Sequence, residues 1–153
     1  MDPEPENTLM IEAFEWYSPA DQKHWKRIKE ALPTLRELGV DKVWIPPACK
    51  AGNSTGNGYD VYDLYDLGEF DQKGSISTKW GSKVELLDLS RSARSQGIGL
   101  VFDAVLNHKA AADYTQQVNA CRVDPDGMYL MSSRLMTVAS CEILTIAKIV
   151  VKR

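Results

Sequence analysis

The residues with the clearest chemical potential follow one apolar run in the second half of the chain. Residues 98–102 consist of apolar side chains and one glycine, and they lead into Asp103, Asn107 and His108. A short apolar run of this kind predicts a buried strand, and α/β proteins carry their sites at the carboxyl ends of such strands. A carboxylate, a carboxamide and an imidazole there could contact a substrate or a cation. Taken alone, however, Asp103 would more often be a turn residue, and His108 a structural histidine.

The residues before this run predict alternating strands and helices. Residues 9–16 alternate imperfectly between apolar and polar side chains, which predicts a first strand. Residues 24–38 place apolar side chains at spacings of three and four, which predicts an amphipathic helix. We expect this helix to break or kink at Pro33 and to stop at Gly39. Residues 40–45 are rich in β-branched and aromatic side chains and predict a second strand.

A long loop separates the second strand from the next helix. Residues 48–79 are rich in glycine and in turn-forming pairs, and loops of this length are usually functional. Ser82 and Glu85 form a capping-box pattern, which predicts a helix that stops at Gly97. The resulting order of strands and helices predicts a parallel α/β sheet. Because the chain contains neither a dinucleotide-binding glycine pattern nor a phosphate-binding loop, a closed barrel is favoured over an open doubly wound sheet.

Composition and charge exclude several classes of function. The chain has 153 residues, with 18 lysines and arginines against 21 aspartates and glutamates. It shows no basic cluster, so we expect no nucleic-acid partner. The acidic N-terminus lacks the pattern of a signal peptide, and the apolar residues 143–151 are too short to span a membrane. We therefore expect a cytoplasmic protein with no membrane partner. Cys49, Cys121 and Cys141 lack metal-ligand spacing and predict reduced thiols.

Several segments together carry a stronger signal than any of them alone. They are residues 14–17 (FEWY), 24–27 (HWKR), 43–48 (VWIPPA), 58–70 (from GYD to GEF), 79–81 (KWG) and 103–108 (DAVLNH). In this order they resemble the amino-terminal part of an α-amylase of glycoside hydrolase family 13. The branch that they resemble is the intracellular or liquefying bacterial type, which fungi also carry. The resemblance extends from about residue 7 to about residue 126.

The resemblance implies a fold and a division of the chain. The fold is α/β, namely a truncated (β/α)8 TIM barrel with its first three strands and their helices. Residues 1–8 would be an N-terminal tail, and residues 9–126 the N-terminal part of the catalytic barrel. Residues 127–153 change abruptly in composition and would be a divergent tail. We hypothesise that this tail arose from a retained intron, a frameshift or a mispredicted gene end.

The resemblance also implies roles for individual residues. Asp103 would organise the pocket at the point of cleavage, His108 would hydrogen-bond the sugar bound there, and Tyr59 would stack on the sugar ring. Trp16, at the end of the first strand, could reach the same cleft. Asn107 would be a ligand of a structural calcium ion, which prefers oxygen ligands. The implied substrate is an α-1,4-glucan: starch, glycogen or a maltooligosaccharide.

The resemblance places no catalytic residue in this chain. Retaining glycosidases need two carboxyl groups roughly 5 to 5.5 Å apart, and the family carries them on later barrel strands. We therefore predict that the chain alone is inactive, that Asn107 alone does not retain calcium, and that the open sheet edges promote self-association. Two alternatives remain open. The chain could be an inactive sugar-binding fragment or a misannotated gene product, or it could belong to a related α-glucosidase or glucan transferase.

Overall fold

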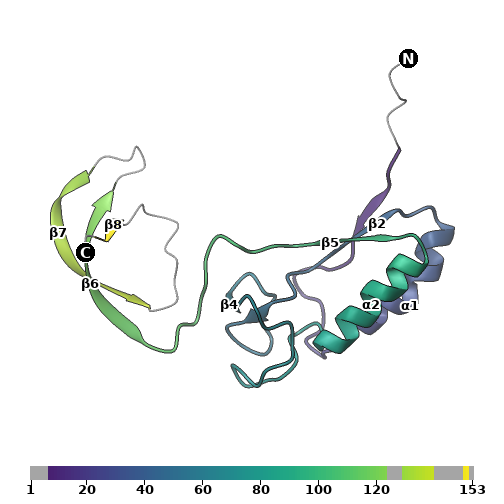
Figure 1. The fold of residues 1–153 in the computed structure, drawn as a ribbon, viewed down its shortest axis with the longest axis horizontal. Coiled ribbons are helices and arrows are strands. Elements are labelled where there is room, and N and C mark those ends of the chain that lie inside the picture. The colour runs from purple at the N-terminus through teal and green to yellow at the C-terminus, as the bar shows by residue number, and fades with distance from the viewer. Residues whose placement is uncertain (1–6, 124–128, 140–149, 152–153) are drawn as a thin grey trace, which may run out of the picture.

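The computed structural model describes residues 7–123, 129–139 and 150–151, and the side chains of residues 7–115. Figure 1 shows the arrangement of its two helices and eight strands. Neither helix is long and apolar enough to cross a membrane. In chain order the elements are β1 (Met10–Glu12), α1 (His24–Glu37), β2 (Lys42–Ile45), β3 (Lys50–Ala51), β4 (Val61–Asp63), α2 (Lys83–Ser95), β5 (Gly99–Phe102), β6 (Thr115–Val123), β7 (Tyr129–Ala139) and β8 (Val150–Val151).

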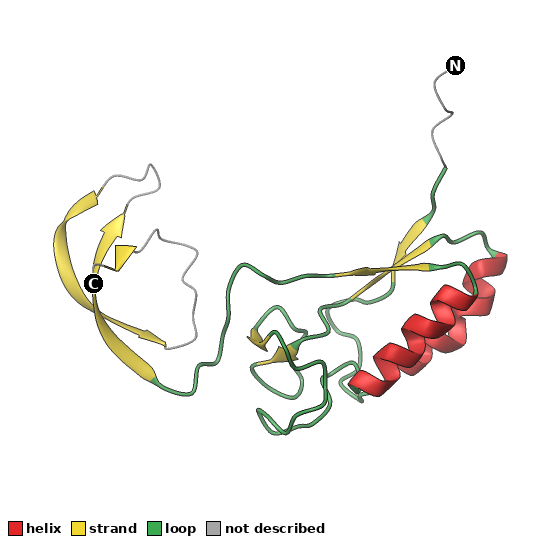
Figure 2. Ribbon diagram, in the orientation of Figure 1, coloured by secondary structure: helices red, strands yellow, loops and turns green. Residues whose placement is uncertain are grey.

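We call the part of the chain from β1 to β5, with its two helices, the α/β part. A parallel three-stranded sheet forms its centre. Its strand order is β1-β2-β5, and both neighbouring pairs are parallel. Ile11, Val43 and Leu100 lie side by side across the three strands. Both helices lie on the same side of this sheet (Figure 2). The predicted α/β fold with a parallel sheet is therefore confirmed.

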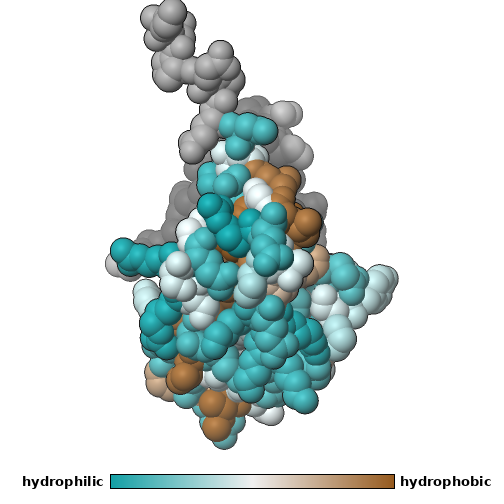
Figure 3. Space-filling model, turned by 90° about the vertical axis from the view of Figure 1, so that its right-hand side faces the viewer, coloured by the Kyte–Doolittle hydropathy of each residue, from teal (hydrophilic) through white to brown (hydrophobic). Residues whose placement is uncertain are grey.

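The hydrophobic core lies between this sheet and the two helices. Trp25 and Leu32 of α1 and Leu89 of α2 are fully buried in it. Full burial of a large apolar side chain contributes roughly 1.5–3 kcal/mol, so these side chains stabilise the packing of the two helices on the sheet. The face of the molecule seen in Figure 3 is mostly hydrophilic, with hydrophobic residues in small groups. The core residues are Trp25, Ile28, Leu32, Val40, Val43, Ile45, Ala48, Trp80, Leu86, Leu89, Ala93 and Ile98.

The two helices test the sequence predictions directly. α2 begins with the predicted capping box, in which the Ser82 side chain accepts from the backbone of Glu85 and the Glu85 side chain accepts from the backbone of Ser82. The predicted break at Pro33 is wrong, because α1 continues through this proline as one helix, whereas a kink there stays a prediction. The proline removes one backbone donor, but the buried side chain of Leu32 keeps this part of α1 on the core.

The strand before Asp103 is not buried as predicted. Gly99 and Phe102 of β5 are exposed, and Leu100 and Val101 are only partly buried. The physical reason is its position, since β5 pairs only with β2 in this three-stranded sheet and is an edge strand. An apolar run cannot distinguish an edge strand from a central one, because burial depends on the neighbouring strands. The expected self-association through such edges stays a prediction.

The loop of residues 48–79 contains a short antiparallel pair, β3 and β4, that the sequence did not predict. Lys50 belongs to β3, and its ammonium donates to the carbonyl oxygens of Phe70 (3.0 Å), Ser75 (2.7 Å) and Ile76 (2.5 Å). It also lies 3.2 Å from a carboxylate oxygen of Asp66, and both side chains are buried. We call Lys50 and Asp66 the loop anchor.

The C-terminal part of the described chain forms a second, antiparallel sheet. Its strand order is β7-β6-β8, and Figure 1 shows it apart from the α/β part, at the end of an extended segment. β6 and β7 pair across the predicted division at residue 127. Residues 124–128 and most of the apolar segment 143–151 lie outside the described residues, except that Val150 and Val151 pair with β6. The origin of the tail stays a prediction.

Candidate functional site

Three of the predicted site residues meet at the carboxyl end of the parallel sheet. Asp103 directly follows β5, and its carboxylate accepts a hydrogen bond of 2.6 Å from the hydroxyl of Tyr59. The indole of Trp16, from the segment after β1, stacks on the ring of Tyr59 with 6.0 Å between centroids and 12° between planes. Parallel strands end at the same edge, so residues distant in sequence come together there. We call Trp16 and Tyr59 the aromatic platform.

The backbone around Tyr59 is held from two sides. Gly58 has a φ of +96°, and a Cβ atom there would lie 2.6 Å from the carbonyl oxygen of Pro47. Only glycine tolerates both the left-handed conformation and this close approach. From the other side, Nε2 of His108 lies 2.8 Å from the carbonyl oxygen of Tyr59, and the amide of Ala110 donates to Val61 at 2.7 Å. The segment after β5 therefore braces the loop that carries Tyr59.

His108 has protein partners at both ring nitrogens. Nε2 faces a backbone carbonyl, which only accepts, so this nitrogen carries the proton in this arrangement. Nδ1 lies 3.3 Å from the side-chain nitrogen of Asn107 and accepts from it. His108 thus positions Tyr59 here, and a direct bond from Nε2 to a sugar would have to replace the bond to Tyr59. Its predicted contact with sugar stays a prediction.

The hydroxyl of Tyr59 is held in its protonated form. Burial of the ring, reinforced by the hydrogen bond to the Asp103 carboxylate, raises the pKa of Tyr59 to about 12. The phenol therefore stays neutral at physiological pH and keeps donating to Asp103. A neutral ring with a fixed hydroxyl suits stacking on the apolar face of a sugar.

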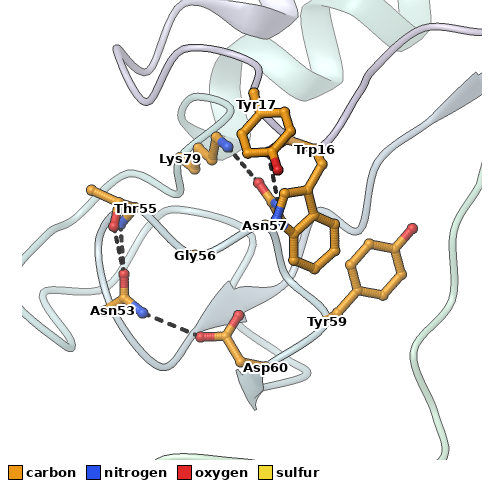
Figure 4. Close-up of a pocket in the computed structure, with 9 residues that line it drawn as sticks. All are labelled: Trp16, Tyr17, Asn53, Thr55, Gly56, Asn57, Tyr59, Asp60 and Lys79. Atoms are coloured by element: carbon orange, nitrogen blue, oxygen red, sulfur yellow. Dashed lines mark hydrogen bonds between the residues drawn. The ribbon is translucent and has the colours of Figure 1, made fainter.

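A pocket of about 540 Å³ opens beside the aromatic platform (Figure 4). The platform forms one wall, and Trp16 remains 63% exposed, so its indole is accessible to a ligand. Polar side chains from the loop surround the rest of the pocket. Such a mixture of aromatic faces and hydrogen-bonding groups fits a carbohydrate. The lining residues are Trp16, Tyr17, Asn53, Thr55, Gly56, Asn57, Tyr59, Asp60 and Lys79.

The sequence did not predict a functional role for two polar residues of this pocket, Asn57 and Lys79. The side-chain nitrogen of Asn57 donates to the backbone carbonyl of Trp16 at 3.1 Å, and its side-chain oxygen accepts from the ammonium of Lys79. Lys79 is only 5% exposed. Burial lowers its pKa, although Glu15 acts in the opposite direction. In the sequence, Asn57 belongs to a turn-forming Asn-Gly pair and Lys79 to the segment KWG, and neither pattern indicates a binding residue.

The predicted calcium ligand does not have a complete set of partners among the described residues. Asn107 is exposed, and in the described part of the chain no three acidic, histidine or cysteine side chains cluster as metal ligands would. Calcium takes six to eight oxygen ligands, whereas Asn107 offers one amide oxygen. The described residues therefore do not fit a calcium ion by themselves.

Comparison with known proteins decides the family. A model of the α-amylase catalytic domain matches residues 12–131, which is well over half of the chain. The chain belongs to the α-amylase family. The α-amylase of Bacillus licheniformis is 48% identical over 119 residues, which cover 78% of this chain and 23% of that protein. The cytoplasmic α-amylase of Escherichia coli K12 is 41% identical over 121 residues, covering 78% of this chain and 24% of the relative. The chain thus spans about a quarter of the length of these α-amylases.

Solved structures agree with this family at the level of the fold. The crystal structure of truncated alternansucrase from Leuconostoc mesenteroides matches with a TM-score of 0.70 at 22% identity. The match covers 86% of this chain and 13% of the alternansucrase chain. At this identity the match shows a likeness of fold alone, and it supports a fold of the TIM-barrel type.

Proposed function

We propose that this chain supplies the glucan-binding wall of an α-amylase, which cleaves α-1,4-glucans with retention. The observation that carries the proposal is the aromatic platform, in which the ring of Tyr59 lies beside Trp16 and donates its hydroxyl to Asp103. The exposed indole offers a flat apolar surface, and the pocket beside it offers hydrogen-bonding side chains. Together these groups can bind one face of a glucose unit by stacking and its hydroxyl groups by hydrogen bonds.

The proposal separates binding from bond cleavage. Retaining hydrolysis needs a nucleophilic carboxylate and an acid/base carboxyl roughly 5 to 5.5 Å apart. The resemblance to the family assigns neither of them to residues of this chain. Beside the platform, the carboxylate of Asp103 accepts a hydrogen bond from the hydroxyl of Tyr59. We therefore propose that the 153-residue chain binds maltooligosaccharides without hydrolysing them.

Calcium and cellular location belong to the same proposal. In the complete family member, Asn107 would supply one oxygen to a structural calcium ion and further ligands would come from elsewhere. The name of the Escherichia coli relative supports a cytoplasmic location, as does the proposed likeness to the intracellular or liquefying branch. The relatives reported above are named α-amylases, so an α-glucosidase or a transferase is not favoured.

The test is a binding titration coupled to an activity assay. We expect maltoheptaose to change the indole NMR signal of Trp16 in the purified chain, with saturation. Trp16→Ala should weaken binding about tenfold, which corresponds to about 1.4 kcal/mol. Tyr65→Ala is the matched control, because Tyr65 is an equally aromatic residue of the same loop, is 88% exposed and does not line the pocket.

The same samples decide whether the chain cleaves glucan. We expect no new reducing ends when the wild-type chain is incubated with soluble starch. Release of maltooligosaccharides that survives Trp16→Ala would indicate a contaminating enzyme. Release that disappears with Trp16→Ala would contradict the proposed separation of binding from cleavage. Absence of any maltoheptaose effect on the wild-type chain would contradict the proposed binding function.

A further inference from the structure

Asn57 connects the two halves of the platform through its side chain. Trp16 lies in a turn that Glu15 and Ser18 close by themselves, with Ser18 donating its amide to Glu15 and the hydroxyl of Ser18 accepting from the amide of Glu15. Tyr59 lies two residues after Asn57, in the loop before β4. The carboxamide of Asn57 donates to the carbonyl oxygen of Trp16 at 3.1 Å and so ties this turn to the loop. Stacking then acts between two segments that are already fixed.

Asn57 is itself held firmly enough to act as a support. The indole nitrogen of Trp80, which is 1% exposed, donates to the backbone carbonyl of Asn57 at 3.2 Å. The buried ammonium of Lys79 donates to the side-chain oxygen and thereby orients the carboxamide, because an ammonium can only donate. The remaining amide nitrogen must then face Trp16. Figure 4 shows Asn57 behind the indole, between Lys79 and the platform.

Trp16 needs such a support because its own packing is weak. Trp16 is 63% exposed, so burial alone does not select one position for the indole. Exposed aromatic side chains lose rotamer entropy when a ligand orders them. A support that orders the indole beforehand would lower this cost and raise the affinity for a flat ligand.

We propose that Asn57 is a positioning residue that fixes Trp16 against Tyr59 and thereby sets the affinity of the chain for α-glucan. The inference rests on the proposed function of the platform. Asn57 itself need not contact the sugar. Its role is to present Trp16 in the orientation that a glucose ring requires.

Asn57→Asp tests this role, because aspartate has the same shape but no side-chain donor. The acceptor for Lys79 is kept and becomes a carboxylate, so we expect the melting temperature to be unchanged or slightly raised. The other carboxylate oxygen would face the carbonyl of Trp16, and the two acceptors would repel each other. We expect about fivefold weaker binding of maltoheptaose, as for the loss of one hydrogen bond. We also expect a shifted Trp16 indole signal before any sugar is added.

Two further variants separate positioning from charge and from general damage. Thr55→Asp adds the same charge at another residue that lines the pocket, and it should leave the sugar-free Trp16 signal unchanged. In a Trp16→Ala background, Asn57→Asp should cause no further loss of affinity, because residues that act through one another are not additive. If Asn57→Asp does not fold, Asn57→Ala removes the same donor without a charge and is judged by the same measurements.

The outcomes distinguish this inference from the proposed function. An unchanged Trp16 signal together with unchanged affinity in Asn57→Asp would overturn the inference. The same fivefold loss in the Trp16→Ala background would overturn it as well, since Asn57 would then act directly on the sugar or through charge. If the wild-type chain binds no maltoheptaose, the proposed function fails, whereas the sugar-free Trp16 signal still decides whether Asn57 positions the indole.

Discussion

The two ends of the loop of residues 48–79 each bury a lysine, but they give its ammonium group different partners. At the loop anchor, Lys50 and Asp66 are almost completely buried and are surrounded by backbone partners. At the platform end, Lys79 is also buried, but it borders an open pocket and bonds to the neutral side chain of Asn57. One end is a closed polar network within the protein, while the other leaves groups available to a ligand.

The difference shows how a loop with little regular structure can hold an exposed aromatic ring. Buried charges are tolerated when every hydrogen-bonding group has a partner. In the loop anchor, three carbonyl oxygens surround Lys50, and the amides of Gly68 and Glu69 donate to one carboxylate oxygen of Asp66. The other carboxylate oxygen has no hydrogen bond but pairs with Lys50 at 3.2 Å. The platform end instead uses fewer and more accessible contacts, such as the bond from Asn57 to the carbonyl of Trp16.

We expect the largest loss of stability when the positive charge of Lys50 is removed from the loop anchor. Lys50→Met leaves the buried carboxylate of Asp66 without its cation, and breaking a buried pair in this way costs about 3–5 kcal/mol. Urea unfolding of the α/β part measures this change. Lys73→Met is the matched control, since Lys73 pairs with the exposed Asp113 and such pairs contribute about 0–1 kcal/mol. Equal effects of the two substitutions would remove the distinction between the anchor and the surface.

A second expected effect is loss of stability in acid through Asp66. Burial tends to raise the pKa of Asp66, but the amides of Glu69 and Gly68 and the charge of Lys50 outweigh it, so the pKa is lowered from 3.8. A lowered carboxyl pKa contributes stability above pH 3.8 that is lost as the pH falls through the folded pKa. Unfolding midpoints measured from pH 6 down to about pH 2 should fall in this window. A flat profile there would contradict the role of Asp66.

At the platform end, we expect Asp103→Asn to change the titration of Tyr59 more than it changes the free energy of unfolding. The pKa of Tyr59 is about 12, in part because the Asp103 carboxylate accepts a hydrogen bond from its hydroxyl. Without that negative charge, the pKa should move down toward its ordinary value of 10.0. Ultraviolet titration of tyrosinate, compared with a Tyr59→Phe spectrum, follows this single group. No change in the titration would mean that burial of Tyr59 alone sets its pKa.

The smallest expected effect is that of Lys79→Met. Its ammonium loses hydration on burial, as its lowered pKa records, and methionine relieves this cost while losing the bond to Asn57. The two terms oppose each other, so we expect a change within about 1 kcal/mol. The same substitution at Lys50 and at Lys79 thus gives a direct comparison of the two ends by urea unfolding. A loss at Lys79 as large as that at Lys50 would show that the platform end is an anchor too.

Local patterns in the sequence predicted the elements and missed the loop. The capping box at Ser82 and the parallel order of strands depend on neighbouring residues and on general rules of chain connection, so both were foreseen. The prediction that β5 is buried was wrong, because the burial of a strand depends on its neighbouring strands. Lys50 bonds to carbonyls more than 20 residues further along the chain, and no local pattern reports such a contact.

The site was foreseen only as far as the family resemblance reached. That resemblance singled out Tyr59, Asp103 and His108, which the structure brings together, and Trp16, which stacks on Tyr59. It did not single out Asn57, whose importance depends on the rotamer that Lys79 imposes. A residue that acts by orienting another residue can be identified from the contacts in the fold, but not from the spacing of residues in the sequence.

The close approach of Gly58 to Pro47 limits how the pocket can be redesigned. A single methyl group at residue 58 would meet the Pro47 carbonyl at 2.6 Å and would have to push the two segments apart. Because Tyr59 follows Gly58 directly in the chain, such a displacement would also move the ring of Tyr59 in the aromatic platform. Libraries that vary the pocket wall should therefore leave residue 58 untouched and seek diversity at the outward-facing Asn53 and Thr55.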